Sequence, residues 1–339
     1  MQPFTGKIYI ENGKIHGTED SGDSVVIFSD GKEYNFENAC CFPGFVDAHG
    51  HVAGLGMHLS GINLNICRSA EECAEKLQKS PQIRGEWIIA RGWNQEKWVN
   101  SDFPGRRLLD IYFPRIPVCL TRVDGHAAWV NSKALEIAGI GHTSPDPPGG
   151  MIIRDRSGIP TGILLDNAMQ LIIKHIPEYT IAQIRSMVIT AMNDLVSCGF
   201  TEVHDMDVPP EYIPIFSELQ QKNKMPIRIQ SYISAQNNEW EKASVMPEDG
   251  EYFNIKGLKF FADGALGSKG AALIEGYRGE PENKGLLFLG ENEFLEKSAL
   301  GLQNGFQIAT HAIGDASCRM VLNVYEKLRE DFPDRILRI

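Results

Sequence analysis

The chain has 339 residues, 42% of them hydrophobic, so it is long enough to bury a large core and exceeds the size of one small domain. Its 33 basic and 44 acidic side chains give a formal net charge of −11 without any basic run, which argues against nucleic acid and anionic membranes as partners. The N-terminus lacks a signal-peptide pattern and no apolar run is long enough to span a bilayer, so we expect a cytoplasmic protein.

Residues 1–42 contain two short apolar alternations, KIYIENGKI and SVVIFSDGKEYNF, interrupted by Asn-Gly and Asp-Gly turn signals. These patterns predict a small antiparallel β element. The next segment, PGFVDAHGH, changes in character, and we expect a buried strand after Pro43 and Gly44 with polar residues crowded at its C-terminal end. Such crowding indicates a functional site.

Residues 80 to about 165 are dense in Gly and Pro and carry the short apolar segments EWIIARGW, PVCLTRV and GMIIRD. We interpret them as a β-rich subdomain inserted into a larger domain that spans residues 43–339. Beyond the insertion, helical patterns near 180–197, 211–222, 291–304 and 316–329 alternate with the strand patterns FTEVHDM, PIRIQSYI, GLKFFADG, FQIATHAIGD and RILRI. This alternation predicts a parallel sheet.

The strand pattern predicts an α/β fold, an incomplete (β/α)8 TIM-type barrel with about five to six strands. Five strands are complete and a sixth has just begun, whereas a closed barrel needs eight. We therefore expect a truncated chain, with an open sheet edge that favours a homo-oligomer or poor solubility. An open doubly wound sheet of five or six strands is the structural alternative.

His49 and His51 lie two residues apart on the first predicted barrel strand, so period-two alternation points both imidazoles to one side at its C-terminal end. One strand thereby offers two ligands to one metal ion, and imidazole suits zinc, iron, nickel or copper. Asp47 shares this face and is placed to orient or supplement the ligands. The alternative is two polar residues exposed at a strand end.

Lys259 is flanked by Leu258 and Phe260 in a strand that is expected to be buried on both sides, where a bare ammonium is costly. A buried lysine readily loses its proton, and the neutral amine can react with carbon dioxide to give a metal-bridging carbamate, or form a Schiff base. The alternative is an ion pair with Asp263 or Asp47.

His311 closes the strand FQIATHAIGD, so three different strands deliver polar groups to the same end of the predicted barrel. A single histidine at a strand end is commonly just hydrogen-bonded, but the convergence of His49, His51, Lys259 and His311 favours a site. Asp315 is expected to cap a helix.

A series of segments resembles the amidohydrolase superfamily, in particular the amidohydrolase family three branch that includes N-substituted formamide deformylases. The match extends over nearly the entire chain, in the order and spacing of that branch, and the series is far more specific than any single motif. Its segments are PGFVDAHGH, ARGWNQEKW, LTRVDGHAAWVNSKAL, GGMIIRDRSGIPTGILLD, GFTEVHDM, GLKFFADGALGS and ATHAIGD.

The resemblance implies that His49 and His51 bind a first metal ion, that carbamylated Lys259 bridges to a second, and that His311 binds this second ion. The cofactor is expected to be one or two divalent ions, with zinc favoured. A histidine that follows an Arg-Ile pair on strand six and a catalytic aspartate on strand eight are expected beyond Arg338 and Ile339, so no catalytic residue is assigned here.

The resemblance also implies that residues 1–42 form part of a small β-sandwich domain and that the insertion covers the active site. Trp93, His126 in the motif DGH at 124–126, and Asp263 are candidates for binding a small-molecule amide substrate. For Trp93 the alternative is an anchor in the core of the insertion.

In the mechanism that the resemblance implies, two metal ions acidify a bridging water, the strand-eight aspartate accepts its proton, and the hydroxide attacks an amide carbonyl. The sequence thus predicts a hydrolase of C–N bonds in amide, N-acyl or N-formyl compounds. Two alternatives stay open: a non-catalytic fragment with an incomplete metal site, and a lyase or aldolase in which Lys259 forms a Schiff base.

Overall fold

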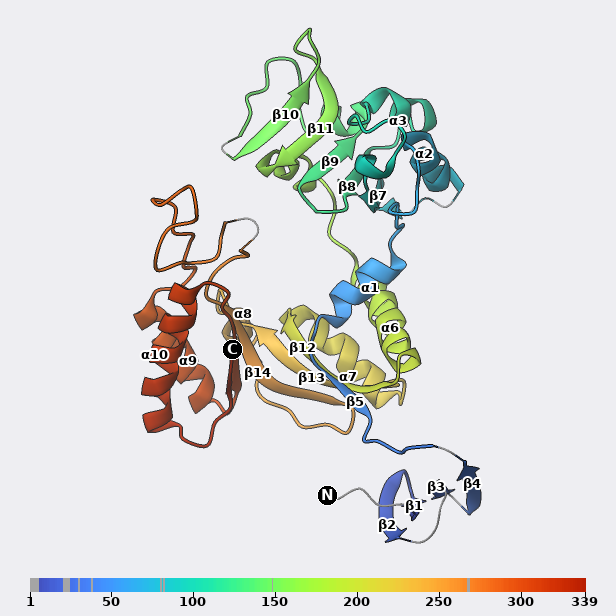
Figure 1. Ribbon diagram of the computed structural model, residues 1–339, viewed down its shortest axis with the longest axis vertical. Coiled ribbons are helices and arrows are strands. Elements are labelled where there is room, and N and C mark those ends of the chain that lie inside the picture. The colour runs from blue at the N-terminus through green and yellow to red at the C-terminus, as the bar shows by residue number, and fades with distance from the viewer. Residues whose placement is uncertain are drawn as a thin grey trace.

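Three separate sheets organise the chain in the computed structural model (Figure 1). The structure describes residues 6–20, 25–29, 31–37, 39–79, 81, 83–147, 149–266 and 269–339. Within these ranges, every helix is too short or too polar to cross a membrane.

The first sheet has four strands in the order β2-β1-β3-β4. Their bounds are β1 Gly6–Glu11, β2 Lys14–Asp20, β3 Val25–Ser29 and β4 Lys32–Phe36. The β1–β2 hairpin turns at Asn12 and Gly13, whose φ angles of 52° and 72° are the left-handed values that an Asn-Gly turn requires. The antiparallel hairpin predicted from these turn residues is therefore present. The central strands β1 and β3 pair in parallel, however, so the prediction of an antiparallel element is wrong for this pair.

The second sheet has six strands in the order β10-β11-β9-β8-β7-β6. Their bounds are β6 Ile83–Arg84, β7 Trp87–Trp93, β8 Val118–Arg122, β9 Ala127–Val130, β10 Gly150–Arg154 and β11 Pro160–Asp166. The short helices around it are α2 Ala70–Lys79, α3 Arg106–Tyr112, α4 Ser132–Ile137 and α5 Gln170–Ile173. Both of its faces are covered by apolar clusters, which explains the near-continuous apolar runs of its strands.

The third sheet is a curled, all-parallel half-barrel of six strands in the order β16-β15-β14-β13-β12-β5. The strands are β5 Phe45–Gly50, β12 Phe200–Val208, β13 Arg228–Ser234, β14 Phe253–Phe261, β15 Gln307–His311 and β16 Leu337–Arg338. Spatial order follows chain order without a reversal, as in a barrel, whereas a doubly wound sheet reverses its strand order at a switch point. The open doubly wound alternative is therefore wrong.

Helices cover the outer face of this half-barrel, as βα winding requires. Their bounds are α1 Val52–Ser60, α6 Ile181–Ser197, α7 Ile213–Gln221, α8 Glu239–Lys242, α9 Glu291–Gln303 and α10 Asp315–Asp331. Helices α6, α7, α9 and α10 lie within a few residues of their predicted limits, since their apolar faces repeat every three to four residues. The N-cap of α10 is Gly314, so the prediction that Asp315 caps this helix is wrong.

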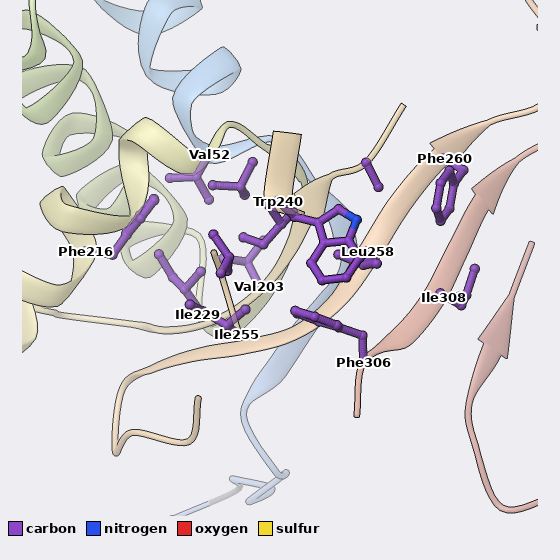
Figure 2. Packing of buried hydrophobic residues seen from close by; sticks show 14 of the residues in the cluster. Val52, Val203, Phe216, Ile229, Trp240, Ile255, Leu258, Phe260, Phe306 and Ile308 are labelled. Atoms are coloured by element: carbon purple, nitrogen blue, oxygen red, sulfur yellow. The ribbon is translucent and has the colours of Figure 1, made fainter. Parts of the chain in front are cut away.

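The main core lies between the outer face of the half-barrel and its helices (Figure 2). Val203, Ile229 and Leu258 project into it from β12, β13 and β14, and Phe216 of α7 meets them. The loop residue Phe306 packs edge-on against Trp240 of α8, with ring centroids 5.1 Å apart. This apolar layer fixes the outer face of β12, β13, β14 and β15, so the alternate side chains of these strands are left to the concave inner face.

Strand β5 is an exception to the buried strands that the sequence predicted. It lies at one edge of the half-barrel, where Phe45 is 60% and Val46 is 47% exposed. The prediction of a buried strand after Gly44 is therefore wrong, because burial of a strand depends on neighbours on both sides and β5 pairs only with β12 in the described structure.

Helix α1 follows β5 and packs directly on the backbone of α6 (Figure 1). A Cβ atom at Gly56 would lie 2.1 Å from the carbonyl oxygen of Met187, so only glycine permits this approach. The contact fixes α1, and with it the C-terminal end of β5, against α6.

We predict that Gly56→Ala lowers the free energy of unfolding by roughly 1–3 kcal/mol, because the methyl group forces the two helices apart. Gly54→Ala on the same helix is the matched control, since its Cβ would lie 3.5 Å from the nearest atom, an ordinary contact. Urea denaturation of the two variants measures the difference. Equal stability would show that α1 shifts freely on α6.

Candidate metal and substrate site

The concave face of the half-barrel carries the polar side chains of its strands. Along β14, Leu258 and Phe260 point into the outer core, whereas Lys259 between them faces inward and is only 2% exposed. The predicted burial of this lysine is confirmed.

His49 and His51 lie side by side at the C-terminal end of β5. Their ring centroids are 5.6 Å apart, and His51 Nδ1 lies 2.8 Å from the carbonyl oxygen of Met206 on β12. A carbonyl only accepts, so Nδ1 carries the proton and Nε2 keeps its lone pair. A carbonyl partner of this kind typically orients a metal-binding histidine.

Burial and nearby charges lower the pKa of two groups at this end of the site, Lys259 and His49. The pKa of Lys259 is lowered first by burial and then by the charge of Arg338, although Asp207 opposes both. The pKa of His49 is lowered by desolvation and then by the charges of Lys259, His51 and Arg338. Both shifts favour the neutral forms that metal binding and carbamate formation require.

The proposed ion pair of Lys259 is absent among the described residues. Asp47 instead accepts the backbone N–H of His49 at 3.0 Å, and Asp263 is bound elsewhere. The lysine Nζ lies 5.5 Å from the ring centroid of Phe261, so its neighbour is an aromatic ring and not a carboxylate.

His311 ends β15 next to β14, as the sequence predicted. Its ring centroid lies 5.4 Å from that of Phe261, the ring that also neighbours Lys259. Its side chain is 27% exposed, and its Nε2 lies 3.9 Å from Asp263 Oδ1. Lys259 and His311 thus lie on neighbouring strands, face the same side of the sheet and share one aromatic neighbour.

Across the described ranges, no group of three or more His, Cys, Asp or Glu side chains is arranged to hold a metal ion. The predicted set contains only three such residues, His49, His51 and His311, and its fourth member is a lysine that becomes a carboxylate ligand only as a carbamate. The residues nevertheless fit a metal chemically, because two adjacent imidazoles are present and one is oriented by a carbonyl.

Asp263 is part of a closed hydrogen-bond cage. Its carboxylate accepts the backbone N–H groups of Ala272, Ile313 and Gly314 at 2.8–2.9 Å and the hydroxyl of Ser317 at 2.6 Å. Burial acts to raise its pKa, but these hydrogen bonds outweigh burial and hold the pKa below its ordinary value. In this structure Asp263 ties the β14 loop to α10, so the substrate contact predicted for it would require the cage to open.

Trp93 lies in the core of the inserted sheet and is 0% exposed. Its Nε1 donates to the carbonyl oxygen of Leu120 at 2.7 Å, and its ring packs edge-on against Trp129. The structure corrects the prediction that Trp93 lines a substrate pocket, because a fully buried indole has no surface left for a ligand. The alternative, an anchor of the insertion, is the role observed.

His126 lies at the end of the inserted sheet with its side chain 58% exposed. Its Nδ1 lies 2.8 Å from Asp166 Oδ1, and both residues line an open pocket. Of the three predicted substrate-binding residues, His126 is the one that the structure leaves open to a ligand.

Arg338 organises the inner face and was not among the predicted site residues. Its guanidinium donates to the carbonyl oxygen of Ala48 at 2.6 Å, to His204 Nδ1 at 2.9 Å and to the Tyr232 hydroxyl at 3.0 Å. These contacts join β16 to β5, β12 and β13 across the open side of the half-barrel. The signal in the sequence was weak. His204 and Glu202 alternate in FTEVHDM so that both face the inner side of the sheet. Nothing in that segment points to Arg338, which follows 134 residues later.

Asp205 is a second unpredicted group. It is 3% exposed, and its Oδ1 accepts the N–H of Val52 at 2.8 Å, at the start of α1 and next to His51. Burial raises its pKa to about 7, the hydrogen bond from Val52 lowers it, and the charge of Asp207 adds to the increase.

We predict that Arg338→Ala increases hydrogen exchange of the backbone amides in β5, because it removes the hydrogen bond to Ala48 and the contacts to β12 and β13. Arg338→Lys should retain part of the protection, since an ammonium reaches one of these acceptors. Arg335→Ala, at an exposed position nearby, is the control. Unchanged exchange in Arg338→Ala would contradict this role.

We predict that stability falls as the pH rises toward the pKa of Asp205 at about 7. The folded state holds this proton more tightly than the unfolded state, so the free energy of unfolding decreases by roughly 2 kcal/mol between about pH 5 and pH 8. Asp205→Asn should flatten this dependence while its amide oxygen still accepts from Val52. Urea denaturation at both pH values tests it, with Asp331→Asn as an exposed control whose pH dependence should match wild type.

A half-barrel with paired histidines on its first strand and an inward lysine on its fourth defines the class of protein. The profile of the amidohydrolase family matches residues 32–338, and the chain belongs to this family. It is 32% identical to amidohydrolase YtcJ of Bacillus subtilis (strain 168), over 95% of this chain and 63% of that protein. It is 26% identical to N-substituted formamide deformylase of Arthrobacter pascens, over 88% of this chain and 58% of that protein.

Among solved structures, the crystal structure of an uncharacterized metal-dependent hydrolase from Pyrococcus horikoshii OT3 matches with a TM-score of 0.68 and 26% identity. The match covers 90% of this chain and 57% of that one. The chain thus spans about three-fifths of the length of these relatives.

Proposed function

We propose that the chain forms part of a metal-dependent hydrolase that cleaves C–N bonds in small amides, N-acyl or N-formyl compounds. The observation that carries the proposal is the His49–His51 pair, with His51 Nδ1 fixed by the Met206 carbonyl. Family membership and the similarity to a deformylase and to a metal-dependent hydrolase support the reaction class.

The proposed cofactor is one or two divalent ions, zinc first. His49 and His51 would hold one ion, and Lys259 and His311 would contribute to a second. When bound, such ions acidify a water molecule and polarise a carbonyl group. Lys259 would enter this set by adding its neutral amine to carbon dioxide, which forms an N–C bond, releases one proton and leaves a carbamate anion.

The remaining residues would position the site. Asp205 and Met206 hold the end of β5 through Val52 and His51, and Arg338 holds its middle through Ala48. Metal binding can be tested on this chain directly, because His49, His51, Lys259 and His311 all lie within it.

We predict near-stoichiometric metal in the purified chain by plasma mass spectrometry, and its loss in the His49→Ala/His51→Ala double variant. The control is His58→Ala/His142→Ala, which removes two other histidines and should leave the metal content unchanged. Circular dichroism of each variant verifies folding.

A folded but metal-free wild-type chain would contradict the proposal and favour the non-catalytic alternative. Labelling of Lys259 by borohydride in the presence of a carbonyl compound would favour the Schiff-base lyase, which uses the same buried amine.

A further inference from the structure

The open pocket at His126 lies between the inserted sheet and the loop that follows β14. It has a volume of about 810 Å³ and is lined in part by Thr121, His126, Asp166, Gln170 and Lys269. These residues come from segments far apart in the sequence, and none of them belongs to the proposed metal ligands. Figure 1 shows the loop after β14 extending toward the insertion.

His126 is held in this pocket from three sides. Its backbone N–H donates to Asp124 Oδ1 at 3.0 Å, and its carbonyl accepts the N–H of Asp166 at 3.0 Å. Its ring Nδ1 lies 2.8 Å from Asp166 Oδ1. An exposed histidine fixed at backbone and ring has lost its rotamer freedom before any ligand arrives, which lowers the entropic cost of binding.

The backbone around Asp166 is shaped to place its carboxylate. Asp166 has φ 48° and ψ −123°, a strained conformation for a residue with a side chain. Gly149 and Gly150 make room for this turn: a Cβ atom on Gly150 would lie 2.2 Å from the backbone nitrogen of Ala168. Strain that the surrounding structure maintains is typical of binding sites.

The hydrogen-bond chemistry defines the ligand. A carboxylate only accepts, so in the neutral form of the His126 imidazole the proton lies on Nδ1 and Nε2 presents a lone pair. The second oxygen of Asp166 is a further acceptor, and the charge of Lys269 is compensated by its ion pair with Glu280. Two neighbouring acceptors and one net negative charge match a hydrogen-bond donor.

We propose that this pocket binds an ammonium or hydroxyl group of a ligand, and that the ligand is the end of the substrate remote from its reacting amide. Lys269 lies on the loop that follows the strand of Lys259, so the pocket and the inner face of the half-barrel share one segment. This assignment rests on the proposed function only in treating the ligand as substrate, and its test needs neither metal nor turnover.

The test uses three probes with the same alkyl chain: butylammonium, butanol and butyrate. Each is titrated into the full chain, and binding is followed by the NMR shifts of the histidine imidazoles. His126→Phe keeps a ring and removes both nitrogens, and Asp166→Asn removes the charge but keeps the oxygen that accepts from His126. His142→Phe is the matched control, an exposed histidine outside the pocket whose Nε2 contacts the Ser157 carbonyl oxygen at 3.0 Å.

We expect saturable binding of butylammonium or butanol that weakens about tenfold in His126→Phe and is unchanged in His142→Phe. If the preferred group is ammonium, Asp166→Asn weakens the binding of butylammonium and leaves the binding of butanol unchanged. If the preferred group is hydroxyl, butanol binds at least as well as butylammonium to both the wild-type chain and Asp166→Asn. Preference for butyrate, or donor binding that survives His126→Phe, or no saturable binding of either donor, would overturn the proposal. Because these outcomes are read without metal, they are independent of the metal analysis.

Discussion

The cost of burying the Lys259 ammonium is the constraint on which the inner face depends. Strand β14 packs Leu258 and Phe260 into the outer core, so alternation forces Lys259 to the concave side, where it is 2% exposed. No carboxylate of the described residues pairs with it, and its lowered pKa shows that burial outweighs the charge of Asp207. An unpaired buried amine is costly to maintain, and a reaction or a metal that consumes its lone pair relieves that cost.

The edge strand β5 also needs support from the opposite edge of the half-barrel. It pairs with one strand and leaves Phe45 and Val46 largely exposed, yet it positions both paired histidines. Backbone pairing with β12 fixes one side, and Arg338 reaches from β16 to the Ala48 carbonyl on the other. The guanidinium suits this task because its planar fork serves three acceptors on three strands at once.

Local patterns in the sequence predicted the features that depend on neighbours along the chain. The helix limits, the Asn-Gly hairpin, the parallel sheet and the burial of Lys259 all follow from periodicity, turn residues and the alternation of neighbouring segments. The features that were missed depend on distant partners. The burial of Trp93 depends on Trp98 and Trp129, and the exposure of β5 on its place at the sheet edge. Nothing within the segment around Arg338 encodes an acceptor on β5.

Asp263 connects the two polar regions, although it touches neither a proposed metal nor the open pocket. Its four hydrogen bonds fasten the segment after β14 to the first turn of α10, two residues beyond the end of the strand that carries Lys259. The loop fixed in this way carries Lys269 to the wall of the His126 pocket. A carboxylate that is buried, ionised and fully hydrogen-bonded holds a loop more rigidly than apolar contacts do, because each lost hydrogen bond exposes an uncompensated charge. Asp263 therefore holds the loop that runs from the inner face of the half-barrel to the His126 pocket. Its position in the motif FFADG alone does not reveal this role.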